Sequence, residues 1–266
     1  MMEATISFRN VRLGFEEGDV VQGLSFDVMP RQTLVLLGET GTGKTLSLKM
    51  AAGLLKPLEG EIRVLGKTVS KMEEKDLLDF RREIGFVFQE GALFDSMTVE
   101  ENVAYRLREE RVAEDEIEPR VRETLRFVEL EHAIDQVPSE LSGGMRRRAS
   151  IARALITQPP IVLYDSPTAG LDPVTAQTII TLILRLRDIY GVTALLATHR
   201  LQDGFALANY HFDIASQSVK ENTEKPGGKA DSITRFAVLR DGKIFFSGTP
   251  EELAAAKDPY LKRFLV

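Results

Sequence analysis

The chain of 266 residues contains no cysteine, which excludes disulfide bonds and thiolate metal sites. No apolar run approaches the roughly 20 residues that a membrane-spanning helix needs, so any role at a membrane is expected to go through a partner chain. The first ten residues, MMEATISFRN, lack a basic flank followed by an apolar stretch, so no signal peptide is expected. Together these absences predict a cytoplasmic protein.

Positive charge is also in deficit. Lysine and arginine number 34 against 40 aspartates and glutamates, and the formal net charge is -6. The field of such a molecule repels a polyanion, which argues against a nucleic-acid binder. With 43% hydrophobic and 28% charged residues, the composition predicts a soluble globular protein with one sizeable core and appended lobes.

A glycine-rich motif lies in the first fifth of the chain. Residues 38–45, GETGTGKT, fill every place of the pattern G-x-x-x-x-G-K-[ST]. The apolar run 31–37 before it predicts a buried strand, and the pattern of residues 46–55 after it predicts a helix. Backbone N–H groups of such a loop point at phosphate oxygens, and the helix N-terminus adds positive charge. The sequence therefore predicts a nucleoside triphosphate site formed by Gly38, Glu39, Thr40, Gly41, Thr42, Gly43, Lys44 and Thr45.

Two residues of this motif have their own predicted contacts. Lys44 is expected to meet the β- and γ-phosphates, and the hydroxyl of Thr45 to bind Mg²⁺. The apolar run 161–164 ends in Asp165, and P-loop proteins use a carboxylate at such a strand end to hold the metal. A lone strand-end aspartate is usually a turn residue, but together with the phosphate loop Asp165 is predicted to share the metal with Thr45.

The remaining patterns predict an α/β fold. Apolar and polar residues alternate over 6–15 and 20–28, which is typical of antiparallel strands in an N-terminal β lobe. Residues 98–133 have helical periodicity and a charged surface, so a solvated helical lobe is expected. The apolar strands 161–164 and 193–197 flank an amphipathic helix over 174–188, which predicts a parallel βαβ crossover.

Shorter signals complete the expected organisation. A hairpin is expected over residues 61–67, a short apolar strand over 84–88, and a second hairpin around Asp241-Gly242. Thr249 and Glu252 form a capping-box pattern before a C-terminal helix, and residues 216–232 are predicted to be a mobile surface loop. We expect one domain over residues 1–266, with the β lobe and phosphate-loop core in 1–90, the helical lobe in 91–158 and the second part of the core in 159–266.

The segment LSGGM, residues 141–145, precedes a helical pattern that begins with three arginines. It offers a hydroxyl and unblocked amides at a helix N-terminus, which favours a second phosphate contact. Taken alone, Ser-Gly-Gly is a linker turn that any helix can follow.

The phosphate loop, the LSGGM segment and the strand ending in Asp165 together resemble the ATP-binding cassette (ABC) ATPases, over about residues 6–248. The resemblance implies a RecA-like P-loop NTPase core with a mostly parallel sheet, an antiparallel β lobe and an inserted helical lobe. It also implies ATP and Mg²⁺ as cofactors. Its motifs place Gln89 near the metal or water, His199 near the γ-phosphate and Phe15 on adenine, and Leu171-Asp172 match the family's D-loop. Taken singly, Gln89 and His199 are typical surface polar residues, and Phe15 suits a core.

The resemblance further implies a head-to-tail homodimer in the ATP-bound state. Residues of one chain then close over the ATP held by the phosphate loop of the other. The residues expected to act across this dimer are Ser142, Gly143, Gly144, Met145 and Asp172.

One position departs from the family pattern. Most ABC ATPases place a glutamate directly after the strand-terminal aspartate, and here that position is Ser166. Losing general-base help costs about 10²- to 10⁴-fold in rate. We therefore expect a weak ATPase with His199, Gln89 and Ser166 at its catalytic positions; the alternative is a regulatory module in which ATP acts as a switch.

Three segments point to a subgroup of the ABC ATPases. LSGGM, residues 88–97 (FQEGALFDSM) and residues 101–105 (ENVAY) resemble the ATPases of Mla/Mce-type lipid transporters. This resemblance implies a permease partner, a place on the cytoplasmic face of the inner membrane, and phospholipid or another hydrophobic cargo. Leu93, Phe94 and Met97 are predicted to grip a permease helix, with a buried hinge as the alternative. A soluble ABC protein of DNA repair or translation is a further alternative, against which the acidic balance and the absence of a coiled-coil insertion argue.

Overall fold

An antiparallel sheet forms the N-terminal lobe. The computed structural model describes residues 3–16, 18–222 and 233–265 of the chain. The strand order in this sheet is β2-β1-β4-β5, and every neighbouring pair is antiparallel. The strands are β1 (Ile6–Phe15), β2 (Gly18–Val28), β4 (Glu59–Val64) and β5 (Lys67–Thr68). The predicted β lobe and its hairpin over residues 61–67 are thus confirmed.

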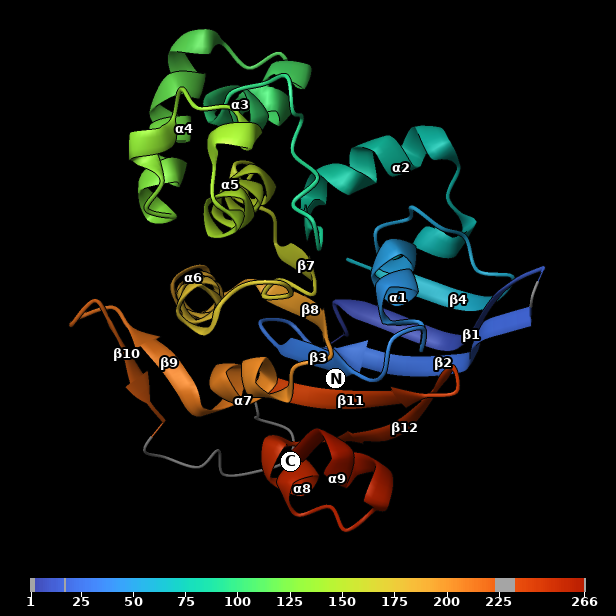
Figure 1. The fold of residues 1–266 in the computed structure, drawn as a ribbon. Helices are drawn as coiled ribbons and strands as arrows, with labels where there is room; N and C mark the ends of the chain where they lie inside the picture. The colour runs from blue at the N-terminus through green and yellow to red at the C-terminus, as the bar shows by residue number, and fades with distance from the viewer. Residues whose placement is uncertain (1–2, 17, 223–232, 266) are drawn as a thin grey trace.

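A second, mostly parallel sheet forms the core (Figure 1). Its order is β12-β11-β3-β8-β7-β6, and only the β11–β12 pair is antiparallel. The strands are β3 (Thr33–Leu37), β6 (Ile84–Val87), β7 (Ile161–Asp165), β8 (Thr193–Thr198), β11 (Thr234–Arg240) and β12 (Lys243–Gly248). Strands β3, β7 and β8 are buried along their whole length, which explains their continuous apolar sequences.

Two hydrophobic clusters cover the two faces of this sheet. Leu34 and Leu36 of β3 pack with helix α1 (Lys44–Ala51) and with the β lobe. Val35 and Leu37 point to the other face and pack with α6 and the helical lobe. The side chains of a strand alternate between its faces, so one short strand joins both clusters. Helix α6 (Pro173–Tyr190) connects β7 to the parallel β8 and confirms the βαβ crossover.

The helical lobe lies at the top of Figure 1. It contains α3 (Val99–Glu109), α4 (Glu114–Phe127) and α5 (Gly143–Leu155). Val121, Leu125 and Val128, which are spaced four and three residues apart in the predicted helical pattern, are fully buried. The remaining helices are α2 (Glu74–Phe80), α7 (Leu201–Asn209), α8 (Pro250–Ala254), α9 (Pro259–Leu265) and the 3-10 helices Val69–Lys71, Arg81–Glu83, Glu131–Ala133 and Pro138–Glu140. Within the described ranges, none of the helices combines the length and apolar character that a bilayer crossing requires.

Local turn chemistry is confirmed at the C-terminal end. Asp241 and Gly242 have φ of 48° and 72°, as the turn between β11 and β12 requires. Thr249 accepts from the N–H of Glu252 and the Glu252 carboxylate accepts from the N–H of Thr249, so the capping box caps α8. The helix predicted over 46–55 instead spans Lys44–Ala51, because the conformation of the phosphate loop allows it to begin two residues earlier.

The predicted loop 216–232 is wrong for part of its length. Strand β10 (Ser218–Glu221) pairs with β9 (Tyr210–Asp213) in a separate two-stranded sheet. The turn is held by Asp213, which accepts from the N–H of Ala215 and pairs with Lys220 across the strands. These stabilising contacts are polar, so hydrophobic periodicity did not reveal the strands. Residues 223–232 of the predicted loop lie outside the described residues.

Candidate nucleotide-binding and catalytic site

The glycines of the phosphate loop are required by its close contacts. A Cβ on Gly38 would lie 2.7 Å from the carbonyl oxygen of Leu239, and one on Gly43 would lie 2.8 Å from Cγ2 of Val21. Gly41 and Gly43 have φ of 85° and 97°, in the left-handed region that glycine favours. Gly43 caps α1 without a side-chain hydrogen bond, which leaves the first N–H groups of the helix available to an anion.

Lys44 begins helix α1, and its side chain folds back onto the loop. Its side chain is buried, and Nζ donates to the carbonyl oxygens of Gly38 (2.8 Å) and Glu39 (2.7 Å). Burial lowers the pKa of Lys44, and the charges of Asp165 and Glu39 oppose this shift. Among the described residues this buried ammonium bonds only to loop carbonyls, which suits an arriving phosphate, because the phosphate supplies the negative charge that the carbonyls lack.

Thr45 and Asp165 meet at the end of the loop. Oγ1 of Thr45 donates to Oδ1 of Asp165 at 2.9 Å. Burial raises the pKa of Asp165, while the Thr45 hydrogen bond and the charges of Lys49, Lys44 and Arg147 lower it. A hydroxyl and a carboxylate are the hard oxygen ligands that Mg²⁺ uses when substrate phosphates and waters complete its shell. Across the described residues no group of three or more His, Cys, Asp or Glu is suited to hold a metal by itself. The pair therefore fits a metal that arrives with a nucleotide.

Three further candidates follow strands of the parallel sheet. Gln89 comes two residues after β6, Ser166 directly after β7 and His199 directly after β8, and the pairs β6–β7 and β7–β8 are parallel and neighbouring. All three therefore lie at the carboxyl edge of the sheet that also bears the phosphate loop. Gln89 and His199 are exposed, whereas Ser166 is buried and donates its backbone N–H to Ala197 at 2.8 Å. Phe15 ends β1, and its side chain is 57% exposed.

The LSGGM segment begins helix α5. Ser142 is its N-cap, and the hydroxyl accepts from the N–H of Met145 at 3.2 Å. Gly144 packs against Thr175 at the start of α6, whose N-cap is Asp172. The hydrogen bonds and ion pairs of the described residues do not join the LSGGM residues to the phosphate loop of the same chain.

Several residues near this edge were not predicted. The buried carboxylate of Asp203 accepts from the hydroxyls of Thr168 and Thr198, and so connects the segment after Asp165 to the end of β8. Burial raises the pKa of Asp203, against the effect of these hydrogen bonds. Lys49 also acts on Asp165. Its spacing of four residues from Thr45 on one helix face was a signal that sequence reasoning missed.

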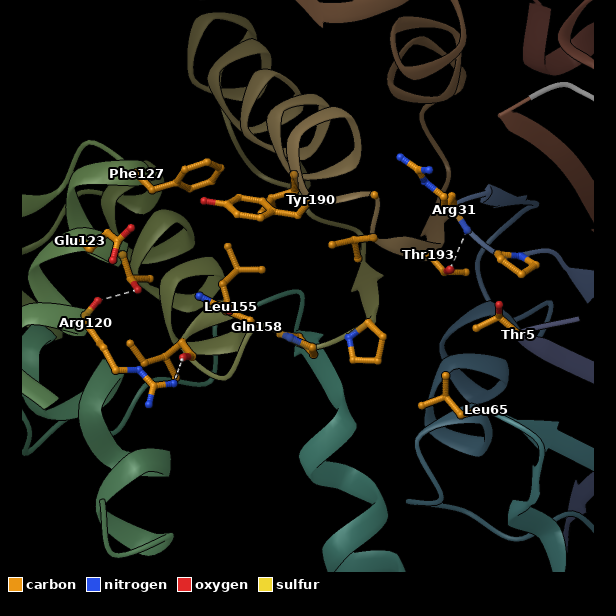
Figure 2. Close-up of a pocket in the computed structure, with 18 residues that line it drawn as sticks. Thr5, Arg31, Leu65, Arg120, Glu123, Phe127, Leu155, Gln158, Tyr190 and Thr193 are labelled. Atoms are coloured by element: carbon orange, nitrogen blue, oxygen red, sulfur yellow. Dashed lines mark hydrogen bonds between the residues drawn. The ribbon is translucent and has the colours of Figure 1, made fainter. Parts of the chain in front are cut away.

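A cavity elsewhere in the structure does not change the assignment of the nucleotide site to the phosphate loop. A cavity of about 470 Å³ opens at the amino ends of the parallel strands, where Arg31 precedes β3 and Thr193 begins β8 (Figure 2). Phe127 and Tyr190 form an aromatic part of its wall, and none of the candidate residues lines it. Ligands of open α/β sheets bind at the carboxyl ends of the strands, so we place the nucleotide at the phosphate loop.

The comparison with known proteins agrees with this geometry. A family model described as ABC transporter matches residues 21–169. The chain belongs to the ABC transporter family. It is an ATP-binding subunit of the ABC type and an ATPase, as its resemblance to the family predicted.

Individual relatives differ in what their names say they transport. The Haemophilus influenzae protein named "Intermembrane phospholipid transport system ATP-binding protein MlaF" is 35% identical over 210 residues, 78% of this chain and 80% of that protein. The Arabidopsis thaliana "Protein TRIGALACTOSYLDIACYLGLYCEROL 3, chloroplastic" is 32% identical over 270 residues, 98% of this chain and 73% of that protein. "Methionine import ATP-binding protein MetN 2" of Bacillus cereus is 38% identical over 200 residues, 74% of this chain and 59% of that protein.

A solved structure shows the same fold. The structure described as "Dimeric structure of a post-hydrolysis state of the ATP-binding cassette MJ0796 bound to ADP and Pi" matches with a TM-score of 0.77 and 27% sequence identity. The match covers 92% of this chain and 98% of that chain. The predicted fold, a P-loop core with a β lobe and a helical lobe, is thereby confirmed.

Proposed function

We propose that this chain powers a membrane permease by binding and hydrolysing Mg-ATP, and that the cargo is phospholipid or another hydrophobic molecule. The observation that carries the nucleotide part is the contact of Thr45 with Asp165 beside the buried Lys44. It joins the phosphate loop to the strand-end carboxylate that the metal needs.

Each candidate side chain has a role in this proposal. Lys44 binds the β- and γ-phosphates, Thr45 and Asp165 hold the metal together with Gln89, and His199 senses the γ-phosphate. The exposed ring of Phe15 offers a face on which adenine stacks. Bound Mg²⁺ would neutralise charge at the phosphates, and the residues of the chain orient ATP relative to the attacking water.

The proposed assembly is a homodimer that forms around ATP. Ser142 and Gly143 are exposed at the N-terminus of α5, where their amides and hydroxyl are available to a second chain. Two glycine-rich helix N-termini then face one triphosphate, and ATP stabilises the dimer by mass action. Asp172 and Met145 belong to the same surface of each chain.

The proposed permease contact is an exposed aromatic pair after Gln89. Phe94 and Tyr105 are 40% and 37% exposed, and their ring centroids lie 4.8 Å apart. Leu93 and Met97 flank Phe94 and are partly buried. Such a patch suits the apolar face of a permease helix, which would place the chain at the cytoplasmic face of the inner membrane.

The cargo proposal is supported by the first two relatives, whose names refer to lipids, and the methionine importer is its main competitor. The test is to purify the chain with its co-expressed permease and to reconstitute the complex in vesicles. Phospholipid is expected to stimulate ATP hydrolysis by the complex, and L-methionine is expected to have no effect. Stimulation by methionine alone would contradict the lipid proposal and leave the ATPase assignment intact.

A further inference from the structure

The segment that carries Gln89 is held by two arginines of α5. Nη1 of Arg147 donates to the carbonyl oxygen of Phe88 at 2.6 Å, directly before Gln89. Arg153 donates to the carbonyl oxygens of Gly91 (3.1 Å) and Ala92 (2.7 Å), which follow Gln89 by two and three residues. The backbone on both sides of Gln89 is therefore bonded to the same helix.

Residues 94–98, which follow this segment, are hydrogen-bonded to α3. The side chain of Asn102 is fully buried; it accepts from the N–H of Phe94 and donates to the carbonyl oxygens of Phe94, Met97 and Thr98. The Arg153 guanidinium also lies 5.7 Å from the centre of the Phe94 ring. The hydrogen bonds on both sides of Gln89 fix its backbone. Because the Gln89 side chain is exposed, it can reach a ligand.

The charge of Arg147 also interacts with that of Asp165. It is 5% exposed, and within the described part of the chain no carboxylate forms an ion pair with it. Burial lowers the pKa of Arg147, and the charges of Asp165 and Glu90 raise it. One buried cation therefore contacts the segment of Gln89 and acts electrostatically on Asp165.

We propose that Arg147 is a positioning residue for Gln89. Together with Arg153 it makes the segment 88–92 move with α5, the helix whose N-terminus is the LSGGM segment. A shift of α5 on closing of the dimer then changes the position of Gln89 relative to Asp165. This inference rests on the proposed role of Gln89 at the metal.

Variants at three arginines of one helix separate positioning from general support. Arg148 is the matched control, because its Nη1 donates to the carbonyl oxygens of Val128 and Glu129, which belong to the helical lobe and not to the Gln89 segment. Arg147→Gln is expected to lower kcat by about 10- to 100-fold, since a misplacement of about 1 Å at a reacting centre can cost about 100-fold. It is also expected to raise the Mg²⁺ concentration for half-maximal activity, with magnesium-free ATP affinity unchanged.

Three further variants test whether the effect is specific to the arginines that hold the Gln89 segment. Arg153→Gln is expected to act in the same direction as Arg147→Gln, and Arg148→Gln is expected to match the wild type in kcat and Mg²⁺ dependence. Arg147→Lys keeps the charge and one donor, so it is expected to restore part of the activity. Equal effects of Arg147→Gln and Arg148→Gln would overturn the inference.

A double-mutant cycle shows whether Arg147 acts through Gln89. In a Gln89→Ala background, Arg147→Gln is expected to cause no further loss, because residues that act through one another are not additive. Full additivity would overturn the inference and leave the metal role of Gln89 standing. If Gln89→Ala has no effect on kcat or Mg²⁺ dependence, the role of Gln89 and the inference both fail.

Discussion

Oγ1 of Thr45 donates a 2.9 Å hydrogen bond to Asp165, although the two residues are 120 positions apart. Thr45 lies in the first turn of α1, and Asp165 ends β7. Strand β8 lies between β3 and β7, and its register aligns Leu37 with Thr198 and Asp165 with Ala197. The two predicted metal ligands are therefore brought together by the sheet before any ligand binds.

Replacing Asp165 tests the metal assignment. Asp165→Asn keeps the size of the side chain and the acceptor for Thr45 but removes the negative charge that Mg²⁺ requires. We expect ATP to bind without magnesium as in the wild type, while the gain in affinity on adding magnesium disappears. Calorimetric titration with MgCl₂ and with EDTA measures both. An undiminished magnesium effect would show that the metal is held elsewhere.

Removing the charge of Lys44 tests the phosphate contact. Lys44→Ala is expected to weaken ATP binding by about 10- to 100-fold, because a hydrogen bond to a charged group is worth about 1.5–3 kcal/mol. Lys49→Ala is the control on the same helix, and it is expected to have a smaller effect because Lys49 is not part of the phosphate loop. Titration with a fluorescent ATP analogue measures both variants. Full affinity in Lys44→Ala would contradict the assignment.

A side chain at Gly144 would collide with Thr175. A Cβ there would lie 2.3 Å from Cγ2 of Thr175, whose hydroxyl donates to Asp172 and so restricts its rotation. We expect Gly144→Ala to lower the free energy of unfolding by about 1–3 kcal/mol, as overpacking does. Thr175→Ser removes the obstructing methyl group and keeps the hydroxyl.

The double variant Gly144→Ala/Thr175→Ser is therefore expected to regain the stability of Thr175→Ser alone. The next nearest atoms, Cβ and Oγ1 of Thr175, lie at 3.6 and 3.7 Å from the added Cβ, which is ordinary contact. Urea unfolding of the four proteins measures the cycle. If Thr175→Ser gives no rescue, the collision is not the cause of the loss.

Features that depend on neighbouring residues in the sequence were predictable. The Asp241-Gly242 hairpin, the capping box at Thr249 and the buried strands of the core follow from residue chemistry and periodicity over a few positions. The phosphate loop is defined by its own eight residues. The contact between Thr45 and Asp165 was also expected, because one metal needs both ligands.

Contacts set by tertiary packing were not predictable. Arg147 and Phe88 are 59 positions apart, and Thr168 and Asp203 are 35 apart. Three successive arginines begin the α5 pattern, and only the packing of this helix decides which carbonyl each one reaches. Strand β10 was missed for a related reason, because polar residues on both of its faces leave no alternation to detect.

Asp203 is expected to make stability depend on pH. Burial raises the pKa of Asp203 in the folded state, so the folded protein binds this proton more tightly than the unfolded chain does. The contribution of Asp203 to stability therefore falls as pH rises from about 4, the pKa of an unperturbed aspartate, to the raised folded value. Asp203→Asn retains an acceptor for both threonines and removes this dependence.

The difference in unfolding free energy between Asp203→Asn and the wild type is thus expected to shift in favour of the variant as pH rises. Urea unfolding at several pH values between 4 and 8 measures the shift. Asp172→Asn is a control for which no shift is expected in this range, because hydrogen bonds from Thr175 lower the pKa of Asp172, so its contribution is lost only below about pH 4. A constant difference across the range for Asp203→Asn would contradict the expected shift.

Ser166 occupies the position at which most ABC ATPases carry a glutamate. We expect Ser166→Glu to raise kcat at least about tenfold, because a positioned general base contributes about 10²- to 10⁴-fold and part of that gain is lost to imperfect placement. Ser166 has φ of 47°, and the strain of this left-handed conformation comes from the Cβ that serine and glutamate share, so the fold and ATP affinity are expected to persist. Steady-state phosphate release measures the rate.

Ser166→Ala distinguishes two explanations of the basal rate. If the Ser166 hydroxyl takes no part in catalysis, Ser166→Ala hydrolyses ATP at the wild-type rate, and turnover depends on His199, Gln89 and the electrostatics of the phosphate loop. If Ser166→Ala loses activity and Ser166→Glu gains none, the buried hydroxyl itself orients the water, and the chain does not use a carboxylate at this position. Such a result would make the hydrogen bond of Ser166 N–H to Ala197 the feature that sets the hydroxyl in place.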